Sequence, residues 1–82
     1  MYKKWIVYIV RCSDSSLYTG ITTDIERRIK EHNSSKKGAS YTSTRRPVVL
    51  CYTEDVMTKS EALKRELEIK KMKKRNKEDL IK

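Results

Sequence analysis

The sequence predicts an α/β domain of the α+β type, in which helices flank a three-stranded, mostly antiparallel sheet. Three observations favour this fold: three runs rich in β-branched and aromatic residues, two stretches with the spacing of a helix capping box, and a short polar connection between the first two runs. The expected order of elements is β-β-α-β-α-α. Because 82 residues leave room for one core, we expect residues 1–82 to form a single domain.

The first strand is expected over Trp5–Val10, a continuous apolar run that suits a strand covered on both faces. A polar turn at Ser13–Ser16 separates it from a second expected strand, Leu17–Thr22. A connection this short predicts an antiparallel hairpin. The third strand is expected over Val48–Thr53, which is again rich in β-branched and aromatic residues.

The first helix is expected to begin at Thr23, because Thr23 and Glu26 have the spacing of a capping box. It should end near His32, where a polar Asn-Ser-Ser stretch follows. The segment from there to Pro47 is polar and basic and is typical of a loop.

The second helix is expected to begin at Thr58, since Thr58 and Glu61 repeat the capping-box spacing. The pattern continues to about Met72. The basic tail, Lys73–Lys82, is predicted to be helical as well.

The charge of the chain points to polyanionic partners. Lys and Arg number 20 against 11 Asp and Glu, which gives a net charge of +9. A charge of this size on a short chain favours nucleic acid first and an anionic membrane surface second, although a lysine-rich soluble surface would give the same composition.

The longest apolar run is too short to span a membrane, and it is not a signal peptide. Two cysteines without metal-ligand spacing argue against zinc and disulfides, so we expect a cytoplasmic protein that does not bind membranes.

Helical geometry separates the charged residues of the first helix, at about 100° per residue. Ile25 and Ile29 define its core face, and His32 falls almost on that face. Arg28 lies on the shoulder of the face, whereas Arg27 points to solvent. Arg28 and His32 are therefore expected to be neighbours at the edge of the buried stripe.

The second helix places a carboxylate among apolar positions. Ala62, Leu63, Leu67 and Ile69 form the predicted apolar stripe, and Glu66 lies within it. A buried carboxylate is costly unless it is paired or bound to a metal. The residues leave two interpretations open, namely a salt bridge to Arg28 that only orders the packing, or a functional site.

Two of the five tyrosines, Tyr8 and Tyr18, lie on the expected hairpin strands. A phenol on a strand can pack its ring and keep its hydroxyl at a wet edge, although an ordinary core position is the default interpretation. The two tyrosines share a face if the connection has an odd number of residues.

Taken together, these residues resemble the signature of GIY-YIG nuclease domains. The resemblance rests on Ile6-Val7-Tyr8, on Tyr18-Thr19-Gly20, and then on Arg28, His32 and Glu66 in that order. It covers nearly the whole chain, and within the family the chain is most similar to small stand-alone bacterial proteins like the catalytic domain of the Slx-type structure-specific endonuclease. Thr19 stands where the family usually has isoleucine or valine. The resemblance implies a GIY-YIG-like fold and hydrolysis of phosphodiester bonds with one divalent metal, Mg²⁺ or Mn²⁺.

The resemblance also implies roles for the central residues. Glu66 would hold the metal through its oxygens. Tyr8 would act as general base on the attacking water or orient it, with a pKa lowered by nearby positive charge. Arg28 would neutralise charge that develops on the phosphate.

Three further residues would support this centre. Tyr18 and His32 would position the phosphate or the water, and His32 could relay a proton. Gly20 would let the backbone approach closely beside the site.

Nine basic residues in two stretches are expected to contact nucleic-acid phosphates. They are Lys36, Lys37, Arg45 and Arg46 in the loop, and Lys70, Lys71, Lys73, Lys74 and Arg75 near the C-terminus. The other interpretation of both stretches is a solvated face and a loop.

The predicted function is therefore a metal-dependent endonuclease that acts on DNA rather than RNA, selects substrates by structure rather than by sequence, and leaves room for a protein partner. The main alternative is a non-catalytic nucleic-acid-binding module with the same fold. A structural subunit of a larger complex would instead require an exposed apolar patch.

Overall fold

A computed structural model describes residues 4–34 and 40–81 of the chain. Three antiparallel strands form one sheet in the order β2-β1-β3: β1 (Trp5–Arg11), β2 (Leu17–Thr22) and β3 (Val49–Val56). The predicted hairpin, the antiparallel sheet and the order of the predicted elements are thereby confirmed. The third strand extends further than predicted because its polar residues lie on an edge strand, where Glu54 can pair with Arg65 of the following helix.

Four helices accompany the sheet: α1 (Ile25–Ser34), α2 (Ser40–Ser43), α3 (Lys59–Lys70) and α4 (Lys74–Ile81). Thr58 caps α3 as predicted, because its hydroxyl accepts a hydrogen bond from the backbone N–H of Glu61. The predicted cap of α1 was wrong by one residue. Asp24, rather than Thr23, accepts the N–H of Arg27 at 3.1 Å, since the Asp24 carboxylate reaches the first turn.

The short helix α2 was not predicted. It lies in the segment that the sequence assigned to a loop, and four residues are too few to give a helical pattern of apolar positions. Of the basic residues expected to bind nucleic acid, Lys36 and Lys37 lie outside the described residues.

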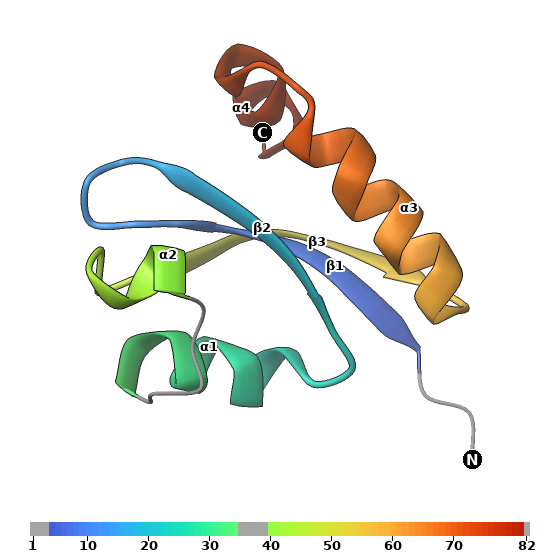
Figure 1. Cartoon of the computed structure of the whole chain (residues 1–82), viewed down its shortest axis with the longest axis horizontal. Helices are drawn as coiled ribbons and strands as arrows, with labels where there is room; N and C mark the ends of the chain where they lie inside the picture. Colours follow the sequence, from blue (N-terminus) through green and yellow to red (C-terminus); the bar gives the residue numbers. More distant parts are fainter. Residues whose placement is uncertain (1–3, 35–39, 82) are drawn as a thin grey trace.

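The helices cover both faces of the sheet, with α1 and α2 on one side and α3 and α4 on the other (Figure 1). Val7 and Ile9 of β1 face α3, where they pack with Ala62 and Ile69. The alternate positions of β1 face α1 and belong to a second buried cluster, which consists of Tyr8, Val10, Cys12 and Val48. The continuous apolar run of the first strand is explained by this double cover.

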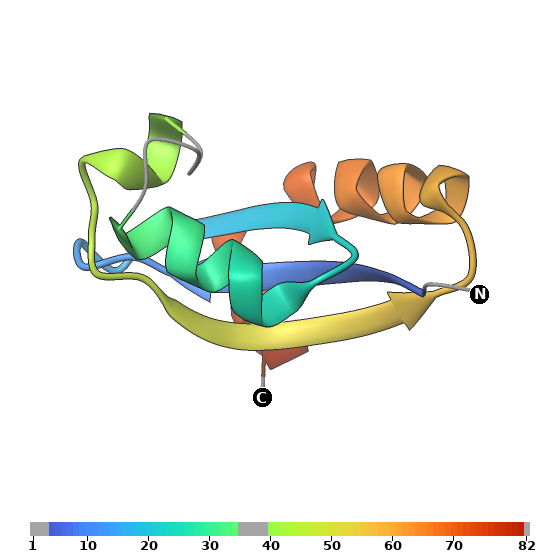
Figure 2. The ribbon, with the colours of Figure 1, turned by 90° about the horizontal axis from the view of Figure 1, so that it is seen from below.

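Helix α3 lies toward the β2 edge of the sheet, away from β3 (Figure 2). Its buried residues are Ala62 and Ile69, and Glu66 lies between them on the same side of the helix. The predicted apolar stripe was wrong in part, because Leu63 and Leu67 are 48% and 55% exposed. The sheet supports the Ala62 side of α3, and the two leucines lie on the side that no described element covers fully.

Candidate functional site

The hairpin brings two tyrosines to one face of the sheet. The connection between β1 and β2 has five residues, 12–16, because β1 ends at Arg11 and β2 begins at Leu17. Tyr8 therefore pairs with Gly20, and Val10 pairs with Tyr18. Residues directly opposite each other in an antiparallel pair point to the same side, so Tyr8 and Tyr18 both lie on the α1 side.

The ring of Tyr8 lies directly against Gly20 of the neighbouring strand. A Cβ atom added to Gly20 would stand 2.5 Å from the Tyr8 hydroxyl oxygen and 2.7 Å from its Cζ. Any side chain would therefore displace the ring, so the glycine is required by packing beside the site. The close approach that the sequence predicted at Gly20 is made by the Tyr8 side chain.

His32 of α1 is completely buried and bonded through both ring nitrogens. Its Nε2 lies 2.7 Å from the hydroxyl oxygen of Tyr8, and its Nδ1 lies 2.8 Å from Oγ1 of Thr42 in α2. Burial, followed by the nearby charge of Arg28, lowers the pKa of His32 to about 4. The imidazole is therefore neutral at physiological pH, with one nitrogen as donor and the other as acceptor.

Tyr8 departs from the expectation that nearby positive charge lowers its pKa. Its side chain is buried, and this burial raises its pKa above the ordinary value of a phenol. Arg28 opposes the shift, because it donates a hydrogen bond and contributes positive charge, but its effect is smaller than that of burial. Tyr8 is therefore a protonated phenol at neutral pH.

Arg28 lies on the shoulder of α1, as the helical geometry predicted. Its Nε donates to the Tyr8 hydroxyl oxygen at 3.4 Å, and its Nη1 forms an ion pair with Glu31 at 3.1 Å. The Arg28 side chain is 23% exposed, whereas that of Arg27 is 60% exposed. Arg28 thus reaches both the buried phenol and the surface.

Glu66 approaches this group from the other face of the sheet. Its side chain is 19% exposed and forms an ion pair with Lys70 at 3.4 Å. The Lys70 ammonium lies 5.8 Å from the centroid of the Tyr18 ring, and the Glu66 charge contributes, as the smallest cause, to the raised pKa of Tyr8. Glu66 therefore lies near the β2 edge, close to the tyrosines.

From the sequence we expect Glu66 and Arg28 to converge with Tyr8 and Tyr18 in one concave site. This expectation was wrong for Glu66, because helix α3 carries it on the face of the sheet opposite Tyr8. Tyr8, Tyr18, Arg28 and His32 form one contact group on the α1 face, in which the Tyr18 and His32 rings lie 5.4 Å apart. Lys70 links Glu66 to this group at the β2 edge, because its ammonium pairs with Glu66 and lies 5.8 Å from the centroid of the Tyr18 ring. The ion pairs described for Arg28 and Glu66 are Arg28–Glu31 and Glu66–Lys70.

A divalent metal held by the protein alone needs several donor side chains in one place. Within residues 4–34 and 40–81, no group of three or more His, Cys, Asp or Glu side chains could hold a metal ion. Glu66 therefore offers a single carboxylate. This fits Mg²⁺, which keeps several waters and binds through one or two carboxylates together with substrate phosphates, and it does not fit a metal held by the protein alone.

The basic residues expected to bind nucleic acid differ in their surroundings. Arg45 pairs with Asp14 at 3.1 Å, and Nε of Arg46 donates to the backbone oxygen of His32 at 2.6 Å. Both arginines thereby also hold the loop to the domain. The remaining side chains near the junction of α3 and α4 are exposed: Lys70, Lys71, Lys73, Lys74 and Arg75.

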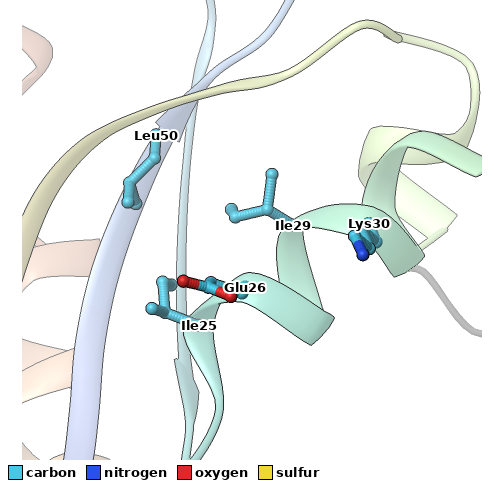
Figure 3. Close-up of a pocket in the computed structure, with 5 residues that line it drawn as sticks. All are labelled: Ile25, Glu26, Ile29, Lys30 and Leu50. Carbon is cyan, nitrogen blue, oxygen red and sulfur yellow. The ribbon is translucent and has the colours of Figure 1, made fainter.

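A surface groove lies beside the candidate site's neighbours on α1. This groove of about 370 Å³ lies between α1 and β3, and it is lined by Ile25, Ile29 and Leu50 together with Glu26 and Lys30 (Figure 3). None of these residues belongs to the tyrosine and histidine group, so this groove is separate from the candidate site.

Three residues near the site were not predicted. Thr42 is buried on His32, and Tyr41 stacks on Tyr18, but both lie in the segment assigned to a loop. Thr19 is buried, and its hydroxyl has no hydrogen-bond partner among the described residues. Only Thr19 gave a signal in the sequence, because it stands where an aliphatic residue is usual.

The structure is thus a small α/β domain in which two tyrosines, an arginine and a histidine lie around a hairpin. The chain belongs to the GIY-YIG family, because a family model described as the GIY-YIG catalytic domain matches residues 4–79. Membership of this family supports an endonuclease-like function with a nucleic-acid substrate.

Several similar proteins carry the name UPF0213 protein. One from Desulfotalea psychrophila is 59% identical over 95% of this chain and 71% of its own length. One from Staphylococcus haemolyticus is 56% identical over 95% of this chain and 94% of its own length. The solution structure of a UPF0213 protein from Bacillus halodurans has a TM-score of 0.60 at 47% identity, with 95% of this chain and 82% of that chain covered. A second solution structure, of a protein from E. faecalis, has a TM-score of 0.64 at 42% identity, with 96% and 85% covered.

Among residues 4–34 and 40–81, no helix is both long enough and apolar enough to cross a membrane.

Proposed function

We propose that this protein is a metal-dependent endonuclease that hydrolyses phosphodiester bonds in DNA and selects its substrate by structure rather than by sequence. One observation carries the proposal, namely the row of contacts from Arg28 through Tyr8 to His32. It joins a cation suited to phosphate, a hydroxyl group and a proton acceptor. The net charge of +9 supports a polyanionic substrate.

Arg28 is proposed to bind the scissile phosphate. A planar guanidinium donates several hydrogen bonds in a fixed fork, which suits the oxygens of a phosphate. The charge on these oxygens grows as water attacks, so the positive charge stabilises the transition state more than the ground state. Tyr18, next to His32 on the same face, is proposed to position the phosphate.

Tyr8 and His32 are proposed to move the proton of the attacking water together. Tyr8 is protonated, so it can accept a proton from water only as it passes its own to Nε2 of His32, 2.7 Å away. This transfer requires the tautomer in which Nδ1–H donates to Oγ1 of Thr42. A bound phosphate brings negative charge that favours the imidazolium, so the substrate itself raises the proton affinity of His32.

Glu66 is proposed to hold the metal, Mg²⁺ or Mn²⁺. Its carboxylate lies near the tyrosines at the β2 edge and is paired only with the exposed end of Lys70 among the described ion pairs. When bound, such a metal would stabilise charge on the phosphate oxygens and favour deprotonation of water. The proposed protein residues, by contrast, orient the phosphate and move the proton.

The test is a cleavage assay on labelled branched, nicked, single-stranded and linear duplex DNA, with matching RNA, with and without Mn²⁺. Glu66→Gln should abolish cleavage and leave DNA binding intact, because it keeps the shape of the side chain but removes the charge that holds the metal. Glu68→Gln on the same helix is the matched control, since the Glu68 side chain is 52% exposed and pairs with Arg65. Unchanged cleavage by Glu66→Gln would overturn the metal-binding role of Glu66. Binding without metal-dependent cleavage by the native protein would favour the non-catalytic alternative.

Glu66→Gln also separates the catalytic role from a packing role. The ion pair that it removes is partly exposed, and such pairs contribute about 0–1 kcal/mol to the free energy of unfolding. The thermal midpoint should therefore change little. A marked loss of stability with unchanged cleavage per folded molecule would show that Glu66 has a packing role.

A further inference from the structure

Four side chains from different parts of the chain form one stack beside the proposed active site. The guanidinium carbon of Arg45 lies 4.0 Å from the centroid of the Tyr41 ring. The Tyr41 ring stacks on Tyr18 with centroids 5.7 Å apart and planes inclined by 23°. The Lys70 ammonium lies 5.8 Å from the centroid of the Tyr18 ring. Two aromatic rings are therefore held between two cations.

The stack starts at the proposed active site and ends at the surface. Tyr18 at its inner end contacts the ring of His32, which bonds the hydroxyl of Tyr8. At its outer end Tyr41 is 38% exposed, and the Arg45 side chain is 35% exposed. A molecule bound to the outer end would thus lie next to a phosphate held at Arg28 and Tyr8.

The edge of the Arg45 guanidinium is occupied by polar contacts, and one of its flat faces covers Tyr41. The other face is the part that can stack on a ligand. Its Nε pairs with Asp14 at 3.1 Å, and its Nη1 donates to the backbone oxygen of Tyr41 at 2.7 Å. Asp14 is itself fixed by the hairpin turn, where its Oδ1 accepts the backbone N–H of Ser16 at 3.0 Å. A guanidinium already paired with a carboxylate contributes less net charge to a phosphate contact, but its face can still stack.

The chemistry of this surface selects a flat, electron-rich and unpaired ligand. Nucleobases stack on tyrosine rings and on arginine planes, and this contact tolerates any base because every base has a flat face. A base inside a duplex already has both faces covered by its neighbours. Only an unpaired base can therefore use the stack without breaking the duplex.

We propose that the Tyr18–Tyr41–Arg45 stack is a binding site for one unpaired nucleobase of the strand whose phosphate enters the active site. This rests on the proposed function for the position of the phosphate, but the base site can be tested without cleavage. It makes single-stranded segments, rather than intact duplex, the part of the substrate that this chain holds.

The test measures binding in EDTA, so that a failure of catalysis does not affect the result. Three labelled ligands of equal length and known charge are compared: a thymidine single strand, an abasic strand with the same number of phosphates, and a duplex. The native protein should bind the thymidine strand roughly tenfold more tightly than the abasic strand, since base stacking on a protein side chain contributes about that factor or more. Equal affinities for these two strands would overturn the proposal without any variant.

Variants then locate the effect. Tyr41→Ala should remove most of the preference for bases, and Tyr41→Phe should keep it, because the Tyr41 ring and not its hydroxyl supports the Arg45 plane on which the base stacks. Arg45→Lys keeps the charge and loses the plane, so it should also reduce the preference. Lys74→Ala, which removes one exposed charge and no plane, should weaken all three ligands alike. Thermal melts show whether each variant is folded, and a folded Tyr41→Ala that retains the full preference for the thymidine strand would overturn the assignment.

Discussion

The hydroxyl oxygen of Tyr8 lies 2.7 Å from Nε2 of His32 in the interior of the protein. Because Thr42 bonds the other ring nitrogen, a neutral imidazole must accept from one hydroxyl and donate to the other. The tautomer of His32 thus sets which of the two hydroxyls donates to the ring and which accepts from it. Helix α2, which carries Thr42, consequently belongs to the same polar network as the first strand.

The first prediction concerns pH and stability. The folded pKa of His32 is about 4, below the ordinary value of 6.5. Between these values the unfolded chain binds a proton that the folded protein does not, so the contribution is fully present above pH 6.5 and is lost as the pH falls toward 4. The expected loss of unfolding free energy is on the order of 3 kcal/mol, measured by denaturant titration at several pH values.

The control for this prediction is His32→Gln, which keeps a polar side chain but cannot titrate. It should be less stable than the native protein at pH 7 and should show a smaller change between pH 7 and pH 5. An equally steep pH dependence in this variant would assign the effect to other groups.

The second prediction concerns Gly20. In Gly20→Ala the new methyl group would meet the Tyr8 ring, so we expect the free energy of unfolding to fall by about 1–3 kcal/mol, as overpacking commonly does. Cleavage should fall as well, because the Tyr8 hydroxyl is displaced from His32 and Arg28. The cost should be smaller when Tyr8 is first changed to Ala, and additive costs in this double-mutant cycle would contradict the contact.

The third prediction concerns Thr19, whose buried hydroxyl has no partner among the described residues. Thr19→Val keeps the branched shape and removes the unpaired group, so the protein should be stabilised by about 1 kcal/mol. Thr19→Ser retains the hydroxyl and should not gain stability. Cleavage should be unchanged in Thr19→Val, and a loss of cleavage with normal folding would give this hydroxyl a role at the site.

The elements of the fold could be predicted because their signals are local. The apolar run of β1 and the cap at Thr58 depend on neighbours within a few residues, and both were confirmed. Helix α2 could not be predicted in the same way. Among the contacts of its residues are that of Thr42 with His32 and that of Tyr41 with Tyr18, and such long-range contacts leave no periodic pattern.

The positions of the candidate site residues on their helices were easier to predict from the sequence than their pKa shifts. Helical rotation separated Arg28 from Arg27 and placed Glu66 on the buried side of its helix, as the structure does. It could not decide that Leu67 would be exposed, because this depends on how α3 lies on the sheet. The upward pKa shift of Tyr8 follows from its burial in the folded protein, which no local sequence pattern reports.

The last prediction concerns Lys70, which neutralises the carboxylate proposed to hold the metal. Its ammonium lies 3.4 Å from Glu66, so it competes by charge with a divalent ion at the same oxygens. Lys70→Met should therefore strengthen Mn²⁺ binding to the free protein by roughly three- to tenfold, the size expected for one partly exposed charge. The increase in thermal midpoint with added Mn²⁺ measures this affinity without reference to cleavage.

The same variant should bind DNA more weakly, because it loses one phosphate contact and a cation beside Tyr18. Lys71→Met provides the matched control, since Lys71 is exposed and makes no ion pair within residues 4–34 and 40–81. It should weaken DNA binding slightly and leave the Mn²⁺ response unchanged.

In the native protein a DNA phosphate can draw Lys70 away from Glu66, so metal should bind more tightly once DNA is present. If Lys70→Met and Lys71→Met respond alike to Mn²⁺, the pair with Glu66 does not control metal entry, and Lys70 is only one of the exposed cations.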